Sequence, residues 1–482
     1  MEAHLGPTDA ALHPGAARQG RLIPDAVPGS FRDPSGFVFV RDKTVFRQVN
    51  QAFADEYDLL MGSGLYASLV ERGLLIPHEE VDELAAAEGA HRILRPEQIP
   101  FVSYPYEWCF SELKAAALAT LDIQEAAMEH GMSLRDASAY NIQFRDGRPV
   151  LIDTLSFGRF DPSEPWVAYR QFCQQFLAPL ALVSYRDARL GRLSQLHLDG
   201  VPLDLATELL PKRAGLKPSL QMHLFAHARS QRRHAGDGAA ARSQTRRGGF
   251  NERSFRGVVS SLHSTVSDLT WSPEESAWTG YYDEAPSYSA EASEHKRTLV
   301  EAFVDRVRPE SVWDLGGNTG AFARIASSRG IPTICFDADA ACVERNYTTV
   351  VKDRERHLLP LVMDLTNPSP AIGLANRERS PLAERGPADM ALALALVHHL
   401  AIGNNVPLDL LADDFRELCA WLVVEFVPKQ DPRVQDLLAM REDVFPGYTR
   451  DGFEAAFGRR FVVERAEELR DSSRVLYLMR GQ

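Results

Sequence analysis

The residues with the clearest chemical pattern lie between positions 312 and 320, where an apolar run ends in an acidic residue and a glycine-rich turn. Val312-Trp313 leads into Asp314-Leu315-Gly316-Gly317-Asn318-Thr319-Gly320. In open sheets of parallel strands, ligands bind beyond the carboxyl ends of the strands, beside turns of this kind. Gly316 and Gly320 leave out side chains where a ligand must pass close to the backbone. We expect a small-molecule site on this turn.

Three later segments repeat the pattern of an apolar strand that ends in polar residues. The run 333–336 ends in Asp337, where a carboxylate can accept the ribose hydroxyls as in dinucleotide folds, and Asp339 is a rival for that role. The run 359–363 is followed by Asp364-Leu365, and the run 390–397 by His398-His399. These strand ends are expected to meet at one edge of a parallel sheet.

In order, type and spacing these segments resemble the class I S-adenosylmethionine-dependent methyltransferase family, from about Trp278 to Gln482. The resemblance implies that S-adenosylmethionine is the cofactor, that Asp314 holds its ammonium group directly or through water, and that Asp364 and Leu365 contact adenine. The cofactor-binding residues that it implies are Asp314, Gly316, Gly317, Asn318, Gly320, Asp337, Asp364 and Leu365. The loop departs from the family at Gly317 and Asn318, where many relatives have Cys or Ser and Gly.

The main rival ligand is NAD. It requires the spacing G-x-G-x-x-G, which residues 314–320 do not supply, and Asp314 before the first glycine would face a pyrophosphate unfavourably. A Rossmann-like domain without S-adenosylmethionine is the structural alternative.

Candidate catalytic residues follow from the chemistry of methyl transfer, which depends on alignment and, for a hydroxyl or protonated amine, on a general base. His398 or His399 could act as the base, since histidine titrates near neutrality, and Glu425 after 423–424 is another candidate. Asn404 and Asn405 are expected to bind substrate. Tyr281, Tyr282, Tyr288 and Lys296 could form a lid over the cofactor, or could serve packing and a solvated helix face.

The N-terminal half contains a second constellation of residues suited to chemistry. Asp136, Asn141 and Asp153 have the spacing of a kinase catalytic loop and its second metal-binding Asp. Residues from about 36 to 225 therefore resemble protein-kinase-like or aminoglycoside-phosphotransferase-like folds, which implies a magnesium site at these three residues and Mg-ATP as a ligand.

This second resemblance has clear departures from the kinase pattern. Leu134 stands where kinases have His, no Gly-rich loop lies near Gly36, and Lys43 falls in a turn. The alternatives are a chance match, a retained scaffold, or a buried ion network of Arg135, Asp136 and Asp153.

The elements that position these residues follow from hydrophobic periodicity. From 291 onward a helix leads into alternating strands and helices, and the chain closes with strands at 461–464 and 475–479, which predicts an α/β, Rossmann-like sheet of seven mostly parallel strands with an antiparallel closing strand. In the N-terminal half, hairpins at 37–49 and 141–152 and helices at 111–130, 166–182 and 203–210 predict an α+β domain. Ser111 is the expected N-cap of the first helix.

The chain as a whole divides into four segments. We expect a disordered tail at 1–30, an N-terminal α+β domain at 31–228, an Arg-rich linker at 229–256 and the methyltransferase domain at 257–482. The eight arginines of the linker could form a patch for nucleic acid or acidic lipid, or could simply be solvated. A helix is expected from about Gly257 to Leu269.

Composition limits the classes of function. The net charge of −13 does not favour nucleic acid, five cysteines without a C-x-x-C pair argue against zinc and disulfides, and no secretory signal or membrane-spanning run is visible, which predicts a two-domain cytoplasmic protein. The leading hypothesis is a methyltransferase with an unidentified acceptor. The alternatives are a kinase-like phosphotransferase with a cofactor-sensing methyltransferase-fold domain, and a non-catalytic scaffold.

Overall fold

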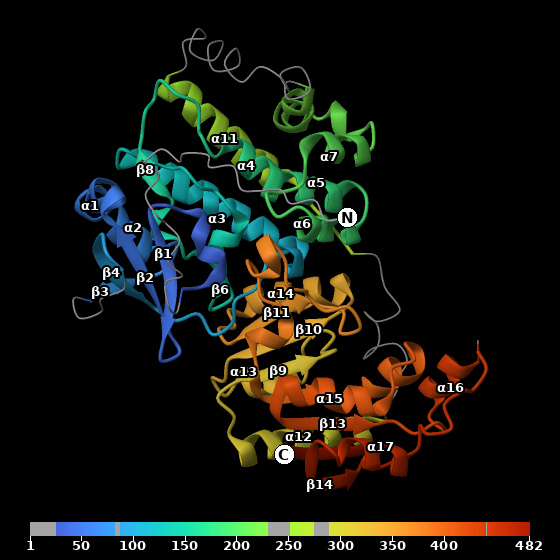
Figure 1. Cartoon of the computed structure of the whole chain (residues 1–482). Coiled ribbons are helices and arrows are strands. Elements are labelled where there is room, and N and C mark those ends of the chain that lie inside the picture. The colour runs from blue at the N-terminus through green and yellow to red at the C-terminus, as the bar shows by residue number, and fades with distance from the viewer. Residues whose placement is uncertain (1–25, 82–86, 230–250, 274–288, 440) are drawn as a thin grey trace, which may run out of the picture.

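The computed structural model describes residues 26–81, 87–229, 251–273, 289–439 and 441–482. Figure 1 shows an N-terminal half, in blue and green, packed against one edge of a C-terminal half, in yellow to red. Most of the expected tail at 1–30, most of the Arg-rich linker and the three tyrosines 281, 282 and 288 fall outside the described residues.

The C-terminal half is built on one seven-stranded sheet in the order β11-β10-β9-β12-β13-β15-β14. Strands β9 to β13 pair in parallel, and β15 runs antiparallel to both β13 and β14. This confirms the predicted α/β sheet with an antiparallel closing strand. The strands are β9 Val312–Leu315, β10 Thr333–Asp337, β11 Leu358–Val362, β12 Ala388–Ala393, β13 Cys419–Phe426, β14 Phe461–Glu468 and β15 Val475–Gly481.

Helices cover this sheet on both faces. On one face, α12 and α13 pack against β9, β12 and β15 through Val300, Phe303 and Ile325. On the other face, α15 packs against β12 and β13, and α17 packs against α15 and places Phe453 beside Phe426 at the end of β13. The helices are α12 Ala290–Val307, α13 Ala323–Ser327, α14 Ala340–Asp353, α15 Leu408–Leu418, α16 Pro432–Leu438 and α17 Arg450–Phe457.

One predicted strand is shorter in the structure. β12 ends at Ala393 and not at Val397, because Ala395 adopts a positive φ of 51° and the chain turns into a π-helical segment, η12 His399–Gly403. This turn brings residues 394–400 around the end of the sheet.

The N-terminal half is α+β, as predicted. Its four-stranded antiparallel sheet has the order β1-β2-β4-β3, and the hairpins expected at 37–49 and 141–152 are present. The strands are β1 Gly36–Arg41, β2 Thr44–Asn50, β3 His78–Glu80, β4 Ala90–Pro96, β5 Met132–Leu134, β6 Ile142–Arg145, β7 Arg148–Leu151 and β8 Phe157–Arg159.

Long and short helices complete this half. They are α1 Ala54–Gly62, α2 Leu65–Glu71, α3 Phe110–Glu129, α4 Tyr169–Phe172, α5 Ala178–Tyr185, α6 Leu193–Leu196, α7 Leu203–Leu209, α8 Pro218–Leu220 and α11 Glu252–Asp268, with a π-helical segment, η6 Cys173–Leu177, between α4 and α5. The predicted N-cap of α3 was wrong: Cys109 is the cap residue and its N–H donates to Glu112 Oε2 at 2.8 Å. Ser111 instead donates from its backbone N–H to Glu344 of α14 at 3.0 Å.

Helix α11 begins inside the segment predicted as a linker. Asn251 caps it by accepting a hydrogen bond from the Ser254 N–H at 3.0 Å, so residues 252–256 are helical. The helix packs along α3, and Lys114 of α3 donates to the carbonyl of Leu269 at 2.8 Å. The boundaries of the four predicted segments stay a prediction.

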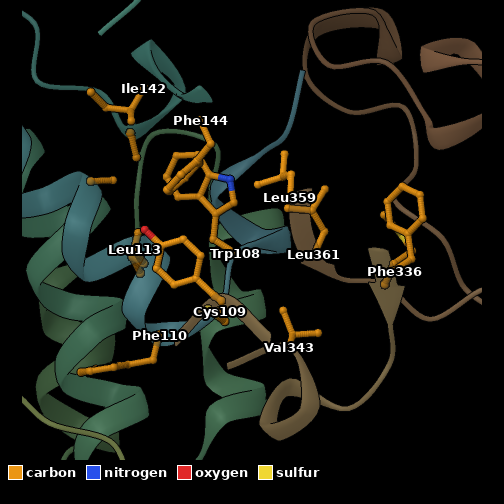
Figure 2. Close-up of a cluster of buried hydrophobic side chains, with 14 of the residues drawn as sticks. Trp108, Cys109, Phe110, Leu113, Ile142, Phe144, Phe336, Val343, Leu359 and Leu361 are labelled. Carbon is orange, nitrogen blue, oxygen red and sulfur yellow. The ribbon is translucent and has the colours of Figure 1, made fainter. Parts of the chain in front are cut away.

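The two halves share one hydrophobic core. Figure 2 shows Trp108 and Phe144 of the N-terminal half beside Leu359 and Leu361 of β11. Phe101 packs edge-on against Trp313 of β9, with ring centroids 5.5 Å apart. Glu107, which is fully buried, accepts two hydrogen bonds from Arg385 at 2.9 and 2.6 Å.

This packing takes the place of a helix that would otherwise cover part of one face of the sheet. The connection from β11 to β12 contains only short 3-10 turns, η10 Leu374–Asn376 and η11 Leu382–Arg385, where α/β sheets usually carry a crossover helix. The N-terminal half therefore covers the face of β9, β10 and β11 that this connection leaves uncovered.

No helix in the described part of the chain is both long enough and apolar enough to cross a membrane.

Candidate active site at the strand ends

The turn after β9 is held in an unusual backbone conformation. Gly316, Asn318 and Gly320 all have a positive φ, of 73°, 53° and 80°. Glycine adopts this region without strain and asparagine tolerates it, which explains these residue types. Of the three glycines, only Gly316 lines the pocket beyond the turn.

The other two glycines make room for protein atoms. A Cβ on Gly317 would lie 2.5 Å from Cys335 Sγ and 2.6 Å from Asp314 Oδ2. A Cβ on Gly320 would lie 2.6 Å from the Asn346 side chain. The interpretation that Gly320 leaves space for a ligand therefore finds no support in these contacts, because α14 occupies that space.

Asp337 fixes this turn from the neighbouring strand. Its Oδ2 accepts from the backbone N–H of Asn318 at 2.8 Å, and its Oδ1 accepts from the backbone N–H of Asp339 at 2.8 Å. Burial raises the pKa of Asp337 to about 6 even though both hydrogen bonds favour the charged form. Asp337 lines the pocket, where its carboxylate is available to a hydroxyl donor.

Asp314 lies beneath the turn and not in the pocket wall. Its side chain is 1% exposed, and Oδ2 has no hydrogen-bond partner among the described residues. Burial raises the pKa of Asp314 to about 7, and the positive charge of Lys296 opposes that rise. A buried carboxylate oxygen without a donor fits a site that completes its hydrogen bonding with a cationic ligand or a water.

The rival acidic residue, Asp339, has a structural task. Its side chain accepts from the Ala341 N–H at 2.8 Å and caps α14. It also lines the pocket, beside Asp337.

Four strand ends surround a single pocket of about 360 Å³, within the range typical of small-molecule sites. From the predicted set, the pocket is lined by Gly316, Asn318, Asp337, Asp364, Leu365, His399 and Asn404. The side of the pocket at the end of β11 carries Asp364, whose Oδ1 accepts from the Thr366 N–H at 2.9 Å. Its lining also includes nine residues that are not among the predicted site residues: Ala338, Met363, Thr366, Leu394, Ala395, Leu396, Leu400, Gly403 and Leu437.

The two histidines have different positions. His399 lines the pocket, and burial lowers its pKa to about 4, so the imidazole is neutral at pH 7. His398 is fully buried behind it, with the ring centroids 4.1 Å apart. Neither ring nitrogen of His398 has a hydrogen-bond partner among the described residues, and burial holds its pKa well below the ordinary range.

Glu425 belongs to a buried ion network. Lys296 Nζ of α12 lies 2.7 Å from Glu425 Oε2, and the two side chains are 2% and 0% exposed. Arg474 Nη1 lies 3.5 Å from Glu425 Oε1, and Arg474 Nε lies 2.7 Å from Asp431. Glu425 does not line the pocket, so its contacts favour a structural role over acid–base chemistry, and Lys296 belongs to the core and not to a lid.

The two predicted substrate-binding asparagines, Asn404 and Asn405, also have different positions. Asn404 lines the pocket and donates from Nδ2 to the carbonyl of His399 at 3.0 Å. Asn405 does not line it, and its Oδ1 accepts from Arg441. A repeated Asn pair in the sequence carries no indication of which member faces a ligand.

The N-terminal constellation does converge, but its oxygens are engaged by protein. Asp153 pairs with Arg47 of β2 at 2.6 Å and accepts from Ser156 at 2.7 Å. Asn141 Nδ2 lies 3.2 Å from Ser156 Oγ, and Asp136 accepts from Gln171 at 2.7 Å. The Arg47 guanidinium therefore lies against the Asp153 carboxylate, where a metal ion would have to bind. This contact favours the alternative of an ion network, but the arginine that pairs with Asp153 is Arg47 and not the predicted Arg135.

Among the residues that the structure describes, no group of three or more His, Cys, Asp or Glu side chains could hold a metal ion.

The strand order, the glycine turn and the pocket at the strand ends define the C-terminal half as a class I methyltransferase fold. The chain is 34% identical to the nodulation protein NoeA of Rhizobium meliloti (strain 1021), over 97% of this chain and 98% of NoeA. The chain belongs to the family of NoeA. No protein-family model matches it.

Solved structures show weaker likeness. The bifunctional kinase–methyltransferase WbdD is 13% identical with a TM-score of 0.31, over 42% of this chain and 42% of WbdD, which is less than half of either protein. Magnesium protoporphyrin IX methyltransferase from Synechocystis PCC 6803 is 14% identical with a TM-score of 0.29, over 42% of this chain and 89% of that one. The N-methyltransferase NodS from Bradyrhizobium japonicum WM9 is 12% identical with a TM-score of 0.29, over 40% and 98%. The fold is therefore assigned from the strand order and not from these matches.

Proposed function

We propose that this protein is an S-adenosylmethionine-dependent methyltransferase whose cofactor binds in the pocket at the ends of β9, β10, β11 and β12. The observation that carries the proposal is the pairing of an acidic residue, Asp337, with the glycine turn of the neighbouring strand inside a pocket of about 360 Å³. Bound S-adenosylmethionine would supply an electrophilic methyl group. No step of this proposal requires a metal.

The residues of this chain would hold the cofactor at three points. Asp337 would accept the ribose hydroxyls, and Asp364 with Leu365 would contact the adenine, since all three line the pocket. Asp314 would balance the positive charge of the ammonium group, because its Oδ2 is buried and has no donor among the described residues. The other residues of the turn, Gly317, Asn318 and Gly320, would contribute by allowing the backbone conformation that forms this side of the site.

The methyl acceptor would meet His399 and Asn404. These are the two predicted catalytic or substrate-binding residues that line the pocket, beside Leu396 and Gly403. A neutral His399 can accept a hydrogen bond, and then a proton, from a hydroxyl or amine of the acceptor. His398, Glu425 and Asn405 would support this wall from behind, because their contacts are with protein.

The kinase-like alternative requires Asp153 to exchange Arg47 for a magnesium ion. The exchange would separate two side chains that lie 2.6 Å apart and are only 13% and 12% exposed, and it would take this partner from the Arg47 guanidinium. We therefore propose that Asp136, Asn141 and Asp153 support the fold, and that the N-terminal half covers the sheet and contributes to acceptor recognition.

A labelling experiment tests the proposed activity. The purified chain is incubated with S-adenosylmethionine labelled on its methyl group and size-fractionated cell extract. Wild type and Asp353→Asn, a change at the exposed end of α14, should transfer label to one fraction, and Asp337→Asn should not. Equal labelling by all three proteins, or label that depends on added Mg-ATP, would contradict the proposal.

A further inference from the structure

A second cavity, of about 420 Å³, lies at the junction of the two halves. It is bounded by the turn between β6 and β7, the end of α2 and the turn between α14 and β11. The Asp146-Gly147 turn is seated against α14: a Cβ on Gly147 would lie 2.9 Å from Val350, and Tyr347 donates to the Gly147 carbonyl at 3.4 Å. Both halves thus contribute walls.

Arginine dominates this cavity. Five arginines line it, and only Asp146 and Glu355 oppose them; the five are Arg72, Arg145, Arg148, Arg354 and Arg356. The chain as a whole has the opposite balance, with 53 Lys and Arg against 66 Asp and Glu. The cavity is therefore a local positive site on an acidic protein.

Most of these cations lack an acidic partner. Arg145 pairs with Glu97 at 2.9 Å, and Glu355 is already paired with Arg324 at 2.8 Å. Within the described part of the chain, no ion pair involves Arg72, Arg148, Arg354 or Arg356, all of which are exposed. Four guanidinium groups around one cavity repel one another unless an anion lies between them.

Helix electrostatics account for only part of this cluster. The C-terminus of α14 carries a partial negative charge, which favours a cation such as Arg354 at the cap position. Arg72 follows α2, and Arg148 comes from a β-hairpin in the other half of the protein. The charge at the end of α14 does not explain why Arg72 and Arg148 line the same cavity as Arg354.

We propose that this cavity binds a ligand carrying two or more phosphate or sulfate groups. Guanidinium groups present several N–H donors in a plane and bind such oxyanions through paired, charge-assisted hydrogen bonds. The site is separate from the methyl-transfer pocket, because α14 begins at that pocket and its 14 residues extend about 21 Å away from it. The proposal does not depend on the proposed methyltransferase activity.

Calorimetric titration of the full chain with pyrophosphate tests this site. EDTA removes divalent metals, and a constant ionic strength of about 0.15 M screens non-specific attraction. A second titration uses a sulfated heparin disaccharide, so that phosphate and sulfate recognition are distinguished. The variants are R148Q/R356Q, and R465Q as a control, since Arg465 is exposed on β14 at the opposite edge of the sheet.

We expect saturable binding of one pyrophosphate by wild type and R465Q. R148Q/R356Q should bind at least about tenfold more weakly, because each lost charge-assisted hydrogen bond is worth about 1.5–3 kcal/mol. Binding of the disaccharide alone would still support the site and identify sulfate as the group recognised. Absence of binding by both probes, or equal binding by R148Q/R356Q with an unchanged melting temperature, would overturn the proposal.

Discussion

The Asp337 carboxylate and the backbone N–H of Asn318 lie 2.8 Å apart, so a side chain at the end of β10 fixes the turn that follows β9. The other carboxylate oxygen of Asp337 holds the backbone of Asp339, where α14 begins. One residue thus joins two of the strand ends that surround the pocket.

Replacing Gly317 by alanine should destabilise the protein. The added Cβ would lie 2.5 Å from Cys335 Sγ and 2.6 Å from Asp314 Oδ2, both of which are buried. Overpacking of this kind typically costs about 1–3 kcal/mol in the free energy of unfolding. Gly403→Ala is the control, because a Cβ there meets no atom within 4 Å. Urea denaturation of both variants checks the prediction, which fails if they unfold at the same midpoint.

Cofactor binding should weaken as the pH falls. Burial raises the pKa of Asp314 to about 7 and that of Asp337 to about 6, so both carboxyls become neutral in mildly acidic solution. A neutral Asp314 cannot balance an ammonium group, so the dissociation constant of S-adenosylhomocysteine should rise roughly tenfold between pH 8 and pH 5.5.

The stability of the unliganded protein should follow the opposite trend. Since both folded-state pKa values exceed the unfolded values, the folded protein holds protons that the unfolded chain releases, and stability falls as the pH rises from about 4 to about 7.

Ligand binding at pH 7 should release protons, and calorimetry in two buffers of different ionisation enthalpy measures this release. An affinity independent of pH, without proton release, would contradict this account.

The Lys296–Glu425 pair should show strong coupling. Lys296→Met removes the cation that lies 2.7 Å from the fully buried Glu425, and loss of one partner of a buried pair costs about 3–5 kcal/mol. Glu425→Gln should be similarly damaging, and the double variant should lose less than the sum of the two. Denaturant unfolding of the four proteins measures the coupling energy. Additive losses would mean that the two side chains do not act as a pair.

The C-terminal half should not fold well by itself. Trp313, Phe336, Leu359 and Leu361 pack against the N-terminal half, and the β11–β12 connection provides no helix to cover them. A fragment of residues 257–482, which also carries most of α11 without its partner α3, should expose this face and aggregate or melt without cooperativity. Sedimentation and thermal unfolding of the fragment test this. A monomeric fragment with a cooperative transition would show that the predicted boundary separates two autonomous domains.

Much of the C-terminal fold could be predicted because its determinants are local. The first strands from Val312 onward are short apolar runs with an Asp at or just after their ends, and their alternation with helices dictates a parallel sheet. The same local pattern located Asp337 and Asp364 at the strand ends. It could not distinguish Asp337 from Asp339, because an acidic residue before a helix serves equally as an N-cap.

The features that the sequence did not reveal depend on contacts between distant residues. Arg47 pairs with Asp153 across 106 positions, which turns a kinase-like spacing into an ion network. Lys296 pairs with Glu425 over a similar separation, so neither side chain faces the pocket. Gly320 resembles a ligand contact in the sequence, yet the space that it leaves is filled by Asn346.

The central claim is that the pocket at the strand ends binds S-adenosylmethionine through Asp337, and calorimetric titration of the full chain tests it most directly. Wild type and Asp353→Asn should bind one S-adenosylhomocysteine, and Asp337→Asn, which places an amide against the Asn318 or Asp339 N–H, should bind at least about tenfold more weakly. Absence of binding by the wild-type protein to both S-adenosylmethionine and S-adenosylhomocysteine, or equal affinity in folded Asp337→Asn, would contradict it.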